Sequence, residues 1–340
     1  TSGNVLGISN TGGTSTTAVS ISNNNFQGFV HSTAATSAHT YIQNTATTLS
    51  QTISSNTFTN LNVNTTGNVT FISDNVGLSS TGSKVISSNS IVTAFNKGSA
   101  GGTVTFFNST TSSTAGSTHT CSNNVFSNVT VTGSTNLQGW INTETNATKT
   151  IQNNYFETIS GVGGTCDILS VSGSGSGTIS GNYITNISGA VSGTGIRAIL
   201  SSTGTKTFSG NFINTISNTN GNVQGISIGA GGTSITVSQN TIHTLSSSAA
   251  SSTVSGISFT SGNVLNIIKN TIYGLSQSNA TVNTTNGAVN GIQIGSLLSG
   301  NTANIYNNLI GNLTAPNASS STIEAIRGIN IIATASSTIT

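Results

Sequence analysis

Apolar residues return along this chain in one short pattern with a period near thirty residues. Its clearest copy lies at residues 205–217, where an apolar residue, two small residues, an asparagine and two further apolar positions follow one another. The asparagine recurs ten times, at intervals of 28 to 38 residues. A regular period of this length is typical of a repeat protein. The recurring asparagines are Asn24, Asn56, Asn89, Asn124, Asn154, Asn182, Asn211, Asn240, Asn270 and Asn308.

Three columns of apolar residues accompany these asparagines. They stand three residues before, two residues after and five residues after each asparagine, in a chain that is only 33% hydrophobic. Most of these residues are β-branched or aromatic, which favours strands over helices. We therefore expect all three columns to face the core, including Phe29 and Ala94 in the third column.

The asparagine separates two apolar columns that lie an odd number of residues apart. Strict alternation along a strand would place inward residues at an even spacing, so the chain must bend between the two columns. Asparagine tolerates the left-handed backbone region and bonds to nearby peptide groups, which predicts that it forms the bend itself. Stacked copies are then expected to form a ladder of side-chain amides.

A second strand pattern, led by glycine, occurs elsewhere in the period. It is clearest at residues 225–228, 256–259, 291–294 and 328–331, where apolar and polar residues alternate. Each period is therefore expected to hold two or three short strands joined by polar turns. A unit of this size cannot bury its apolar face alone, whereas stacked units bury a continuous core.

These features predict an all-β chain that folds as a single-stranded parallel β-helix, with about eleven coils of roughly 30 residues each. Residues 1–340 are expected to form one continuous repeat domain. The pattern resembles the right-handed parallel β-helix (pectate-lyase-like) family, and the composition is similar to Ser/Thr/Asn/Gly-rich secreted bacterial surface proteins. The resemblance implies the handedness but no single activity, because the family includes polysaccharide lyases, hydrolases, phage tailspikes and noncatalytic surface proteins.

Charge is unusually scarce, with 7 Lys and Arg, 5 Asp and Glu, and a net charge of +2 in 340 residues. This balance excludes the basic footprint of a nucleic-acid-binding protein. No apolar run is long enough to predict membrane insertion. Such polarity also fits a disordered chain, but the regular apolar columns argue against disorder. A surface this neutral suits stacking or bundling, and together with the resemblance it predicts an extracellular or cell-surface location.

Neither end of the sequence shows a polar cap, although solenoids normally need one to protect their open edges. We therefore expect the chain to belong to a longer stack or filament. The last interval is the longest and carries an insertion around residues 281–288. Insertions in a solenoid emerge as loops on one flank, where binding features concentrate.

The acidic residues give no convergent catalytic pair. Glycosidases and uronate lyases need carboxylates that meet in one groove, whereas the acids here lie in different periods and at different places within the period. Only Asp167 and Arg197 are expected to be neighbours, one coil apart in equivalent strands, where they would form an ion pair. The sequence predicts no catalytic residue, no metal site and no cofactor. The acids are Asp74, Glu144, Glu157, Asp167 and Glu324.

The cysteines and histidines suggest no special chemistry. Cys121 replaces an apolar residue in the column before the asparagine, and Cys166 falls in a different strand, so both are expected to be buried and unbridged. The four histidines lack paired metal-ligand spacing. Five tyrosines and one tryptophan are scattered along the sequence, which argues against a carbohydrate platform.

A partial cationic column stands five residues before the asparagine, at Lys84, His119, Lys149 and Lys206. One interpretation is a row of exposed residues at the start of a strand, whose stems cover the surface. The other is a ligand flank for anionic surface glycans.

Threonines surround this column, as in Thr118-His119-Thr120 and Thr148-Lys149-Thr150. Rows of Thr-x-Thr are similar to those of ice-binding solenoids, in which a small residue between the threonines points inward. A lysine or histidine is a poor inward residue, so we expect the strand to bend there and the threonines not to form a flat face.

The sequence thus favours a structural extracellular β-helix, such as a surface filament, fibre or adhesin stalk, that associates end to end or laterally with copies of itself. The alternative is a β-helix that binds or degrades carbohydrate, and a cluster of acids and aromatics on one face would favour it. Ice binding is a third, minor alternative. An enzyme is not expected.

Overall fold

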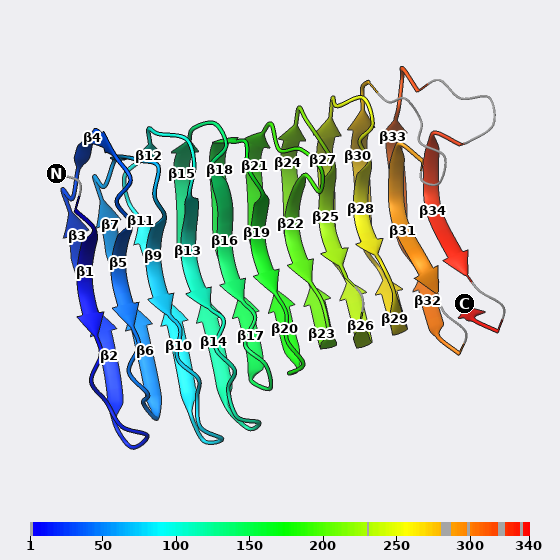
Figure 1. The fold of residues 1–340 in the computed structure, drawn as a ribbon. Coiled ribbons are helices and arrows are strands. Elements are labelled where there is room, and N and C mark those ends of the chain that lie inside the picture. Colours follow the sequence, from blue (N-terminus) through cyan, green and yellow to red (C-terminus); the bar gives the residue numbers. More distant parts are fainter. Residues whose placement is uncertain (1–2, 230, 280–286, 298–299, 319–323, 334–335) are drawn as a thin grey trace.

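The computed structural model describes residues 3–229, 231–279, 287–297, 300–318, 324–333 and 336–340. These residues contain strands and no helix. Every strand pairs with its neighbours in parallel, one repeat apart, and Figure 1 shows the strands side by side from the N-terminus to the C-terminus. The predicted all-β parallel solenoid with about 30 residues per turn is confirmed.

Each turn contributes one strand to each of three sheets, named A, B and C. Sheet A contains eleven strands: β1 (Val5–Asn10), β5 (His39–Asn44), β9 (Val69–Asp74), β13 (Thr103–Ser109), β16 (Asn136–Asn142), β19 (Cys166–Val171), β22 (Ile196–Ser201), β25 (Val223–Ile228), β28 (Val254–Phe259), β31 (Val289–Leu297) and β34 (Ile326–Ala333). Sheet B contains eleven: β2 (Ala18–Ser22), β6 (Ser50–Ser54), β10 (Ser83–Ser87), β14 (Thr118–Ser122), β17 (Thr148–Gln152), β20 (Gly177–Ser180), β23 (Gly204–Ser209), β26 (Gly232–Ser238), β29 (Gly262–Ile268), β32 (Thr302–Tyr306) and β35 (Thr338–Ile339).

Sheet C follows the asparagine and has thirteen strands, because the first turns split their strand in two. The main path contains β3 (Asn25–Gln27), β7 (Thr57–Thr59), β11 (Ser90–Ile91), β15 (Val125–Val131), β18 (Tyr155–Val162), β21 (Tyr183–Gly189), β24 (Phe212–Asn218), β27 (Thr241–Ser247), β30 (Thr271–Gln277) and β33 (Leu309–Thr314). The additional strands are β4 (His31–Ala35), β8 (Val63–Thr65) and β12 (Phe95–Lys97).

The expected number of about eleven coils is too high. The solenoid has about nine turns, because the ten asparagines bound nine complete intervals and the chain outside them adds only partial turns. Eleven strands in a sheet therefore do not correspond to eleven complete turns.

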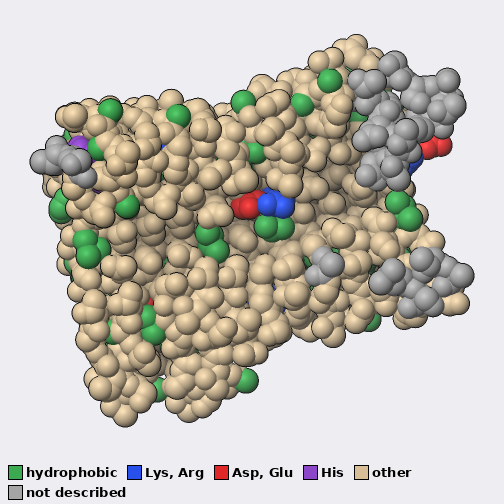
Figure 2. All heavy atoms as spheres, in the orientation of Figure 1, with side chains coloured by type: hydrophobic (Ala, Val, Ile, Leu, Met, Phe, Trp, Pro, Cys, Tyr) green, Lys and Arg blue, Asp and Glu red, His purple; other side chains and the backbone are tan. Residues whose placement is uncertain are grey.

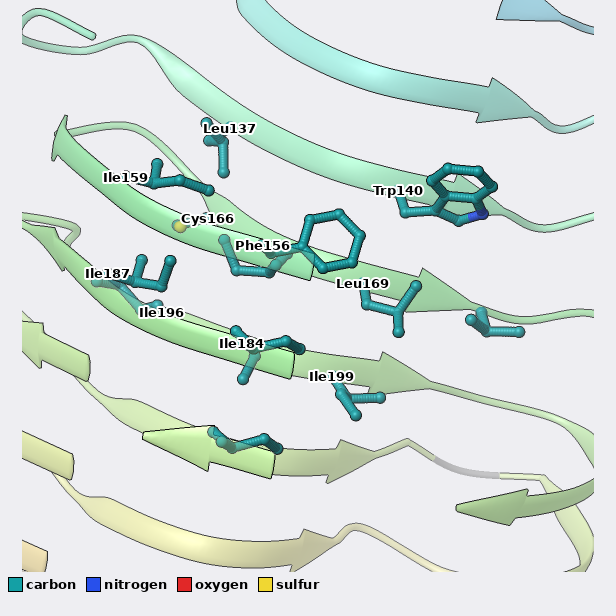
Figure 3. Close-up of a cluster of buried hydrophobic side chains, with 14 of the residues drawn as sticks. Leu137, Trp140, Phe156, Ile159, Cys166, Leu169, Ile184, Ile187, Ile196 and Ile199 are labelled. Atoms are coloured by element: carbon teal, nitrogen blue, oxygen red, sulfur yellow. The ribbon is translucent and has the colours of Figure 1, made fainter. Parts of the chain in front are cut away.

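The core is a continuous column of apolar side chains enclosed by the three sheets. Figure 3 shows part of it, where Phe156 from sheet C and Trp140 and Leu169 from sheet A belong to one buried cluster. Two expected core positions are wrong: Phe29 is 41% exposed and Ala94 is exposed. Phe95 takes the inward place instead and pairs in register with Val129, because the turn before it is one residue longer than in the later repeats.

The asparagine column forms an amide ladder through the whole stack. Each Nδ2 donates to Oδ1 of the asparagine in the next turn at 2.8–2.9 Å, and each backbone N–H donates to the same oxygen at 3.0–3.1 Å. The second amide hydrogen reaches a strand carbonyl of the preceding turn, as in the bond from Asn211 to the Ile179 oxygen at 2.9 Å. The ladder thus satisfies polar groups at a bend that is buried.

The asparagine itself is not the left-handed residue. That conformation belongs to the residue before it, with φ between 54° and 61° in all ten turns. The asparagine side chain points inward, and the preceding residue turns the chain outward at the corner between sheets B and C. The left-handed residues are Asn23, Ser55, Ser88, Asn123, Asn153, Gly181, Gly210, Gln239, Lys269 and Asn307.

The glycine-led strands of sheet A have a steric explanation. A Cβ atom at Gly225 would lie 2.5 Å from the Gly256 carbonyl oxygen and 2.8 Å from the Ile242 side chain. Gly256 would meet Gly291 and Ile272 in the same way. Glycine at this position lets the backbone of sheet A approach the next turn and the core side chains of sheet C.

We predict that Asn211→Val destabilises the protein by about 2–5 kcal/mol, because four hydrogen bonds at a buried bend lose their partner. Thermal unfolding followed by circular dichroism measures the effect. Asn214→Val, on the outer face of the same repeat, is the matched control and should change the melting temperature little. Equal melting temperatures for wild type and Asn211→Val would contradict the role of the ladder.

Candidate functional site

The cationic column lies inside the solenoid, not on its surface. Lys84, His119, Lys149 and Lys206 are each no more than 1% exposed. Both interpretations of this column from the sequence, an exposed row and a glycan-binding flank, place these side chains on the wrong side of sheet B. Alternation continues unbroken through these strands, so the residue between two outward threonines must point inward.

An ionic cluster accounts for the burial of Lys84. Its Nζ lies 2.7 Å from Glu144 Oε1 and 3.7 Å from Asp74 Oδ2, and it donates to the Asp74 carbonyl and to Ser109 Oγ at 2.8 Å each. All the partner side chains are fully buried. A buried charge of this kind requires such partners. The structure therefore unites two acids, Asp74 and Glu144, that the sequence had kept apart.

Burial and pairing act against each other in this cluster. Burial raises the pKa of the Glu144 carboxyl, but hydrogen bonds and charges from His119 and Lys84 outweigh it and hold that pKa well below its usual value. Burial dominates at Asp74 and raises its pKa, against the opposing effects of Lys84 and Asn44. Burial lowers the pKa of His119 to about 4, so its ring is neutral at physiological pH.

His119 and Cys121 stand in an arrangement similar in outline to a nucleophile, a base and an orienting group. His119 Nε2 lies 3.1 Å from Cys121 Sγ, and Nδ1 lies 2.7 Å from Asn142 Nδ2 and 3.8 Å from Glu144 Oε2. All four side chains are fully buried, and burial raises the pKa of the Cys121 thiol. This group is enclosed and packs the core.

Lys149 and Lys206 close the turns between sheets A and B. Lys206 Nζ donates to the carbonyl oxygens of Gly173, Gly175 and Thr203 at 3.0, 2.5 and 3.1 Å. Lys149 donates to the carbonyls of Glu144 and Ser172 in the same manner. Burial lowers the pKa of both ammonium groups to about 8. These lysines satisfy turn carbonyls that no strand partner reaches.

The remaining acids lie apart from this cluster. Asp167 and Arg197 form the predicted ion pair across neighbouring strands of sheet A, with Nε–Oδ1 at 2.6 Å and Nη2–Oδ2 at 2.9 Å. Glu324 pairs with Arg327 at 3.1 Å, and Glu157 lies on the outer face of sheet C. Figure 2 shows how few charged atoms reach the visible face. No two carboxylates converge on an open groove within the described residues.

The two cysteines are unbridged and buried, as predicted. Among the residues that the structure describes, no group of three or more His, Cys, Asp and Glu side chains could hold a metal ion. In the same part of the chain, no helix is long and apolar enough to cross a membrane. The expected insertion at residues 281–288 lies almost entirely outside the described residues.

A groove of about 560 Å³ runs along the corner that follows sheet C. Glycine, serine, alanine and threonine line most of it, among them Gly161, Ser188 and Ser217. None of the lining side chains is an acid, a lysine, an arginine or a histidine, so the groove holds no general acid or base beside its hydroxyl groups.

The outer face of sheet B is rich in hydroxyl groups. The threonines on either side of the inward lysines and histidine both point outward, which contradicts the expected bend at this point. Across five successive turns the two outward columns contain only threonine and serine: Thr118, Thr120, Thr148, Thr150, Ser176, Thr178, Thr205, Thr207, Ser234 and Thr236.

The outer face of sheet C carries a row of aromatic side chains that the sequence interpretation missed. Rings from five successive turns lie in contact, so three of the tyrosines that look scattered along the sequence are neighbours in space. The missed signal is periodic: the residues stand one or three positions after the repeating asparagine. The row consists of Tyr155, Tyr183, Phe212, His243 and Tyr273.

Comparisons with protein-family models, with curated proteins and with solved structures returned no match. The parallel β-solenoid repeat is therefore established by the structure alone.

We predict that Lys206→Met destabilises the protein by about 2–5 kcal/mol, because three turn carbonyls lose a buried donor. Chemical denaturation at pH 7 measures the change. Thr205→Ala, one residue away on the outer face, is the control and should stay close to wild type. If Lys206→Met has the same free energy of unfolding as wild type, the Lys206 side chain does not stabilise the core through these carbonyls.

The pH dependence gives a second readout for Lys206. Its folded pKa of about 8 lies below the ordinary value of 10.5, so the unfolded chain binds more protons between these values. Stability rises with pH where the unfolded state binds more protons. Wild type should therefore gain stability relative to Lys206→Met as the pH rises from 8 towards 10.

Proposed function

We propose that this protein is a structural element of an extracellular surface, a β-solenoid stalk or fibre that extends by stacking further turns of the same kind. We assign it to the right-handed parallel β-helix type, as the resemblance of its repeat implies, and to the secreted bacterial surface proteins of similar composition. The observation that carries the proposal is the use of polar groups: the asparagines, buried lysines and buried acids all bond within the stack.

The positions of the described reactive side chains are consistent with a structural role. The cluster of a thiol, an imidazole and a carboxylate around His119 is enclosed, and the groove that follows sheet C is lined mostly by small uncharged residues. Meanwhile, three parallel sheets and an amide ladder link every turn to the next. Such a stack resists bending and shear because each turn must break several hydrogen-bonded columns to move.

The last described turn supports end-to-end stacking. Ile329 pairs in register with Ile292, which is fully buried, yet Ile329 is 48% exposed. Ile326 and Ile339 of the same turn are 42% and 50% exposed. At the other end, β1 presents an open edge with Leu6 49% exposed. Open parallel edges with apolar side chains are templates for further parallel strands, and we propose that turns of the same kind stack head to tail on these two edges.

We predict that the 340-residue chain forms linear assemblies whose length grows with concentration. Electron microscopy and light scattering after size exclusion measure this, with length increments of about 50 Å for eleven strands at ~4.8 Å spacing. A charged residue on the open end, Ile329→Asp, should leave monomers. Val264→Asp, on the outer face of sheet B, is the control and should still assemble. A wild-type chain that stays monomeric at every concentration would refute end-to-end stacking.

A specific observation favours ice binding as a second candidate. The ten outward hydroxyl side chains of sheet B form two columns with no charged residue among them. Neighbouring turns lie ~4.8 Å apart and neighbouring columns roughly 6.6 Å apart. Threonine supplies a methyl group and a hydroxyl in a stiff rotamer, so the array presents a fixed lattice to water. The objection drawn from the sequence, an inward lysine or histidine, no longer applies because Glu144 and turn carbonyls satisfy these groups.

We predict thermal hysteresis and ice-crystal shaping by the wild-type protein, measured by nanolitre osmometry. Thr178→Tyr, in the middle of the array, should abolish the activity because a bulky ring interrupts the two columns. The control is Thr130→Tyr on sheet C, which should retain it. Crystals that grow as in buffer alone would exclude this second function.

A further inference from the structure

The aromatic row on sheet C is a continuous apolar surface that the fold does not require. Tyr183 and Phe212 stack with ring centroids 4.9 Å apart and an interplanar angle of 5°, and His243 and Tyr273 stack at 4.7 Å and 4°. The intervening pair, Phe212 and His243, meets edge to face at 5.2 Å, and Tyr155 extends the row at 5.7 Å from Tyr183. Four steps of ~4.8 Å give the row a length of about 19 Å.

The same positions are not aromatic in the other turns. The residue after the asparagine is Asn25, Thr57, Ser90 and Val125 in the first four turns, and the strands there still pair in parallel. The rings therefore do not serve the general register of sheet C. They are confined to five successive turns, and the two ends of the row, Tyr155 and Tyr273, are 46% and 38% exposed.

Each ring has a polar neighbour two residues away on the same outer face. Glu157 stands beside Tyr155, and Asn214 stands beside Phe212. In the next two turns the ring moves to the second outward position, and threonine takes the first, at Thr241 and Thr271. The row thus crosses the sheet obliquely, with hydrogen-bonding groups along both of its sides.

This alternation of ring and hydrogen-bonding group matches one class of ligand. Pyranose rings have an apolar C–H face and a rim of hydroxyl groups, and sites for such amphipathic ligands combine aromatic surface with a few polar groups. An extended polysaccharide could follow the row with one sugar after another in contact with a ring. A compact ligand would contact only a fraction of it.

The charged residues beside the aromatic row indicate which kind of polysaccharide, neutral or acidic, the row would bind. Among the described residues of the row and its polar neighbours, Glu157 is the acidic side chain, and burial lowers the pKa of His243, which favours its neutral form. A carboxylate disfavours an acidic glycan. The nearest cation in sequence, Lys269, lies at the corner before Thr271 and not among the rings. We propose that the aromatic row of sheet C binds a neutral, extended polysaccharide, aligned with the solenoid axis. This function is additional to the structural role.

The experiment is a binding assay of the 340-residue chain with amorphous cellulose, chitin and a soluble neutral β-glucan, alongside polygalacturonate as the acidic comparison. We expect binding to at least one neutral glycan and weaker binding to polygalacturonate. The test variant is Tyr183→Thr with Phe212→Thr, because threonine already occupies this column at Thr57 and Thr241. It should keep the wild-type melting temperature and weaken binding roughly tenfold or more.

The matched control is Tyr306→Thr, an exposed aromatic residue on sheet B, at 49% exposure. It should bind as wild type does. Equal loss in the control would mean general adsorption through exposed rings and would overturn the proposal. The proposal would also be overturned if the wild-type protein bound none of the neutral glycans. The same holds if the double variant lost lateral self-association but bound glycan as wild type does.

Discussion

Parallel stacking places every side chain about 4.8 Å from the side chain at the same position of the next turn. Each column must therefore consist of residues that tolerate contact with their own kind. Asparagine side chains donate and accept hydrogen bonds along the axis, and aromatic rings stack on one another. Threonine side chains are small enough to lie next to one another in a column. Charged residues do not tolerate such contact, because like charges at this distance repel. The scarcity of charge in the chain is a consequence of this constraint.

The cationic column shows how the constraint is met where charge does occur. Lys84, His119 and Lys149 are direct neighbours in sheet B, but the ring between the two lysines is neutral. Gly177 separates Lys149 from Lys206 in the same way. Glu144 reaches into the interior from a turn and supplies the opposite charge. Two uncharged positions, together with the acids Glu144 and Asp74 beside Lys84, thus allow three lysines to share one buried column.

The sequence was sufficient for the repeat, the sheets and the amide ladder, because these depend on patterns within one period. It was insufficient for the buried cations, since Lys84 and its partner Glu144 are 60 residues apart and Glu144 lies in an irregular turn. It also misplaced the left-handed residue, because that position holds Asn, Ser, Gly, Gln or Lys and shows no compositional signal. The Asp167–Arg197 pair was predictable because both residues occupy the same place in consecutive repeats. The aromatic row was less apparent in the sequence because the ring shifts from one to three positions after the asparagine between Phe212 and His243.

The ionic cluster also affects how the molecule responds to mechanical load. Most contacts in a solenoid join only adjacent turns, so a chain pulled from its ends peels away one turn at a time. Glu144, Ser109, Asp74 and Lys84 bond across three consecutive turns. Those turns cannot separate singly without leaving a buried charge unpaired, so they yield together. In a stalk of the proposed kind, this segment would be the last to open, after the turns on either side of it.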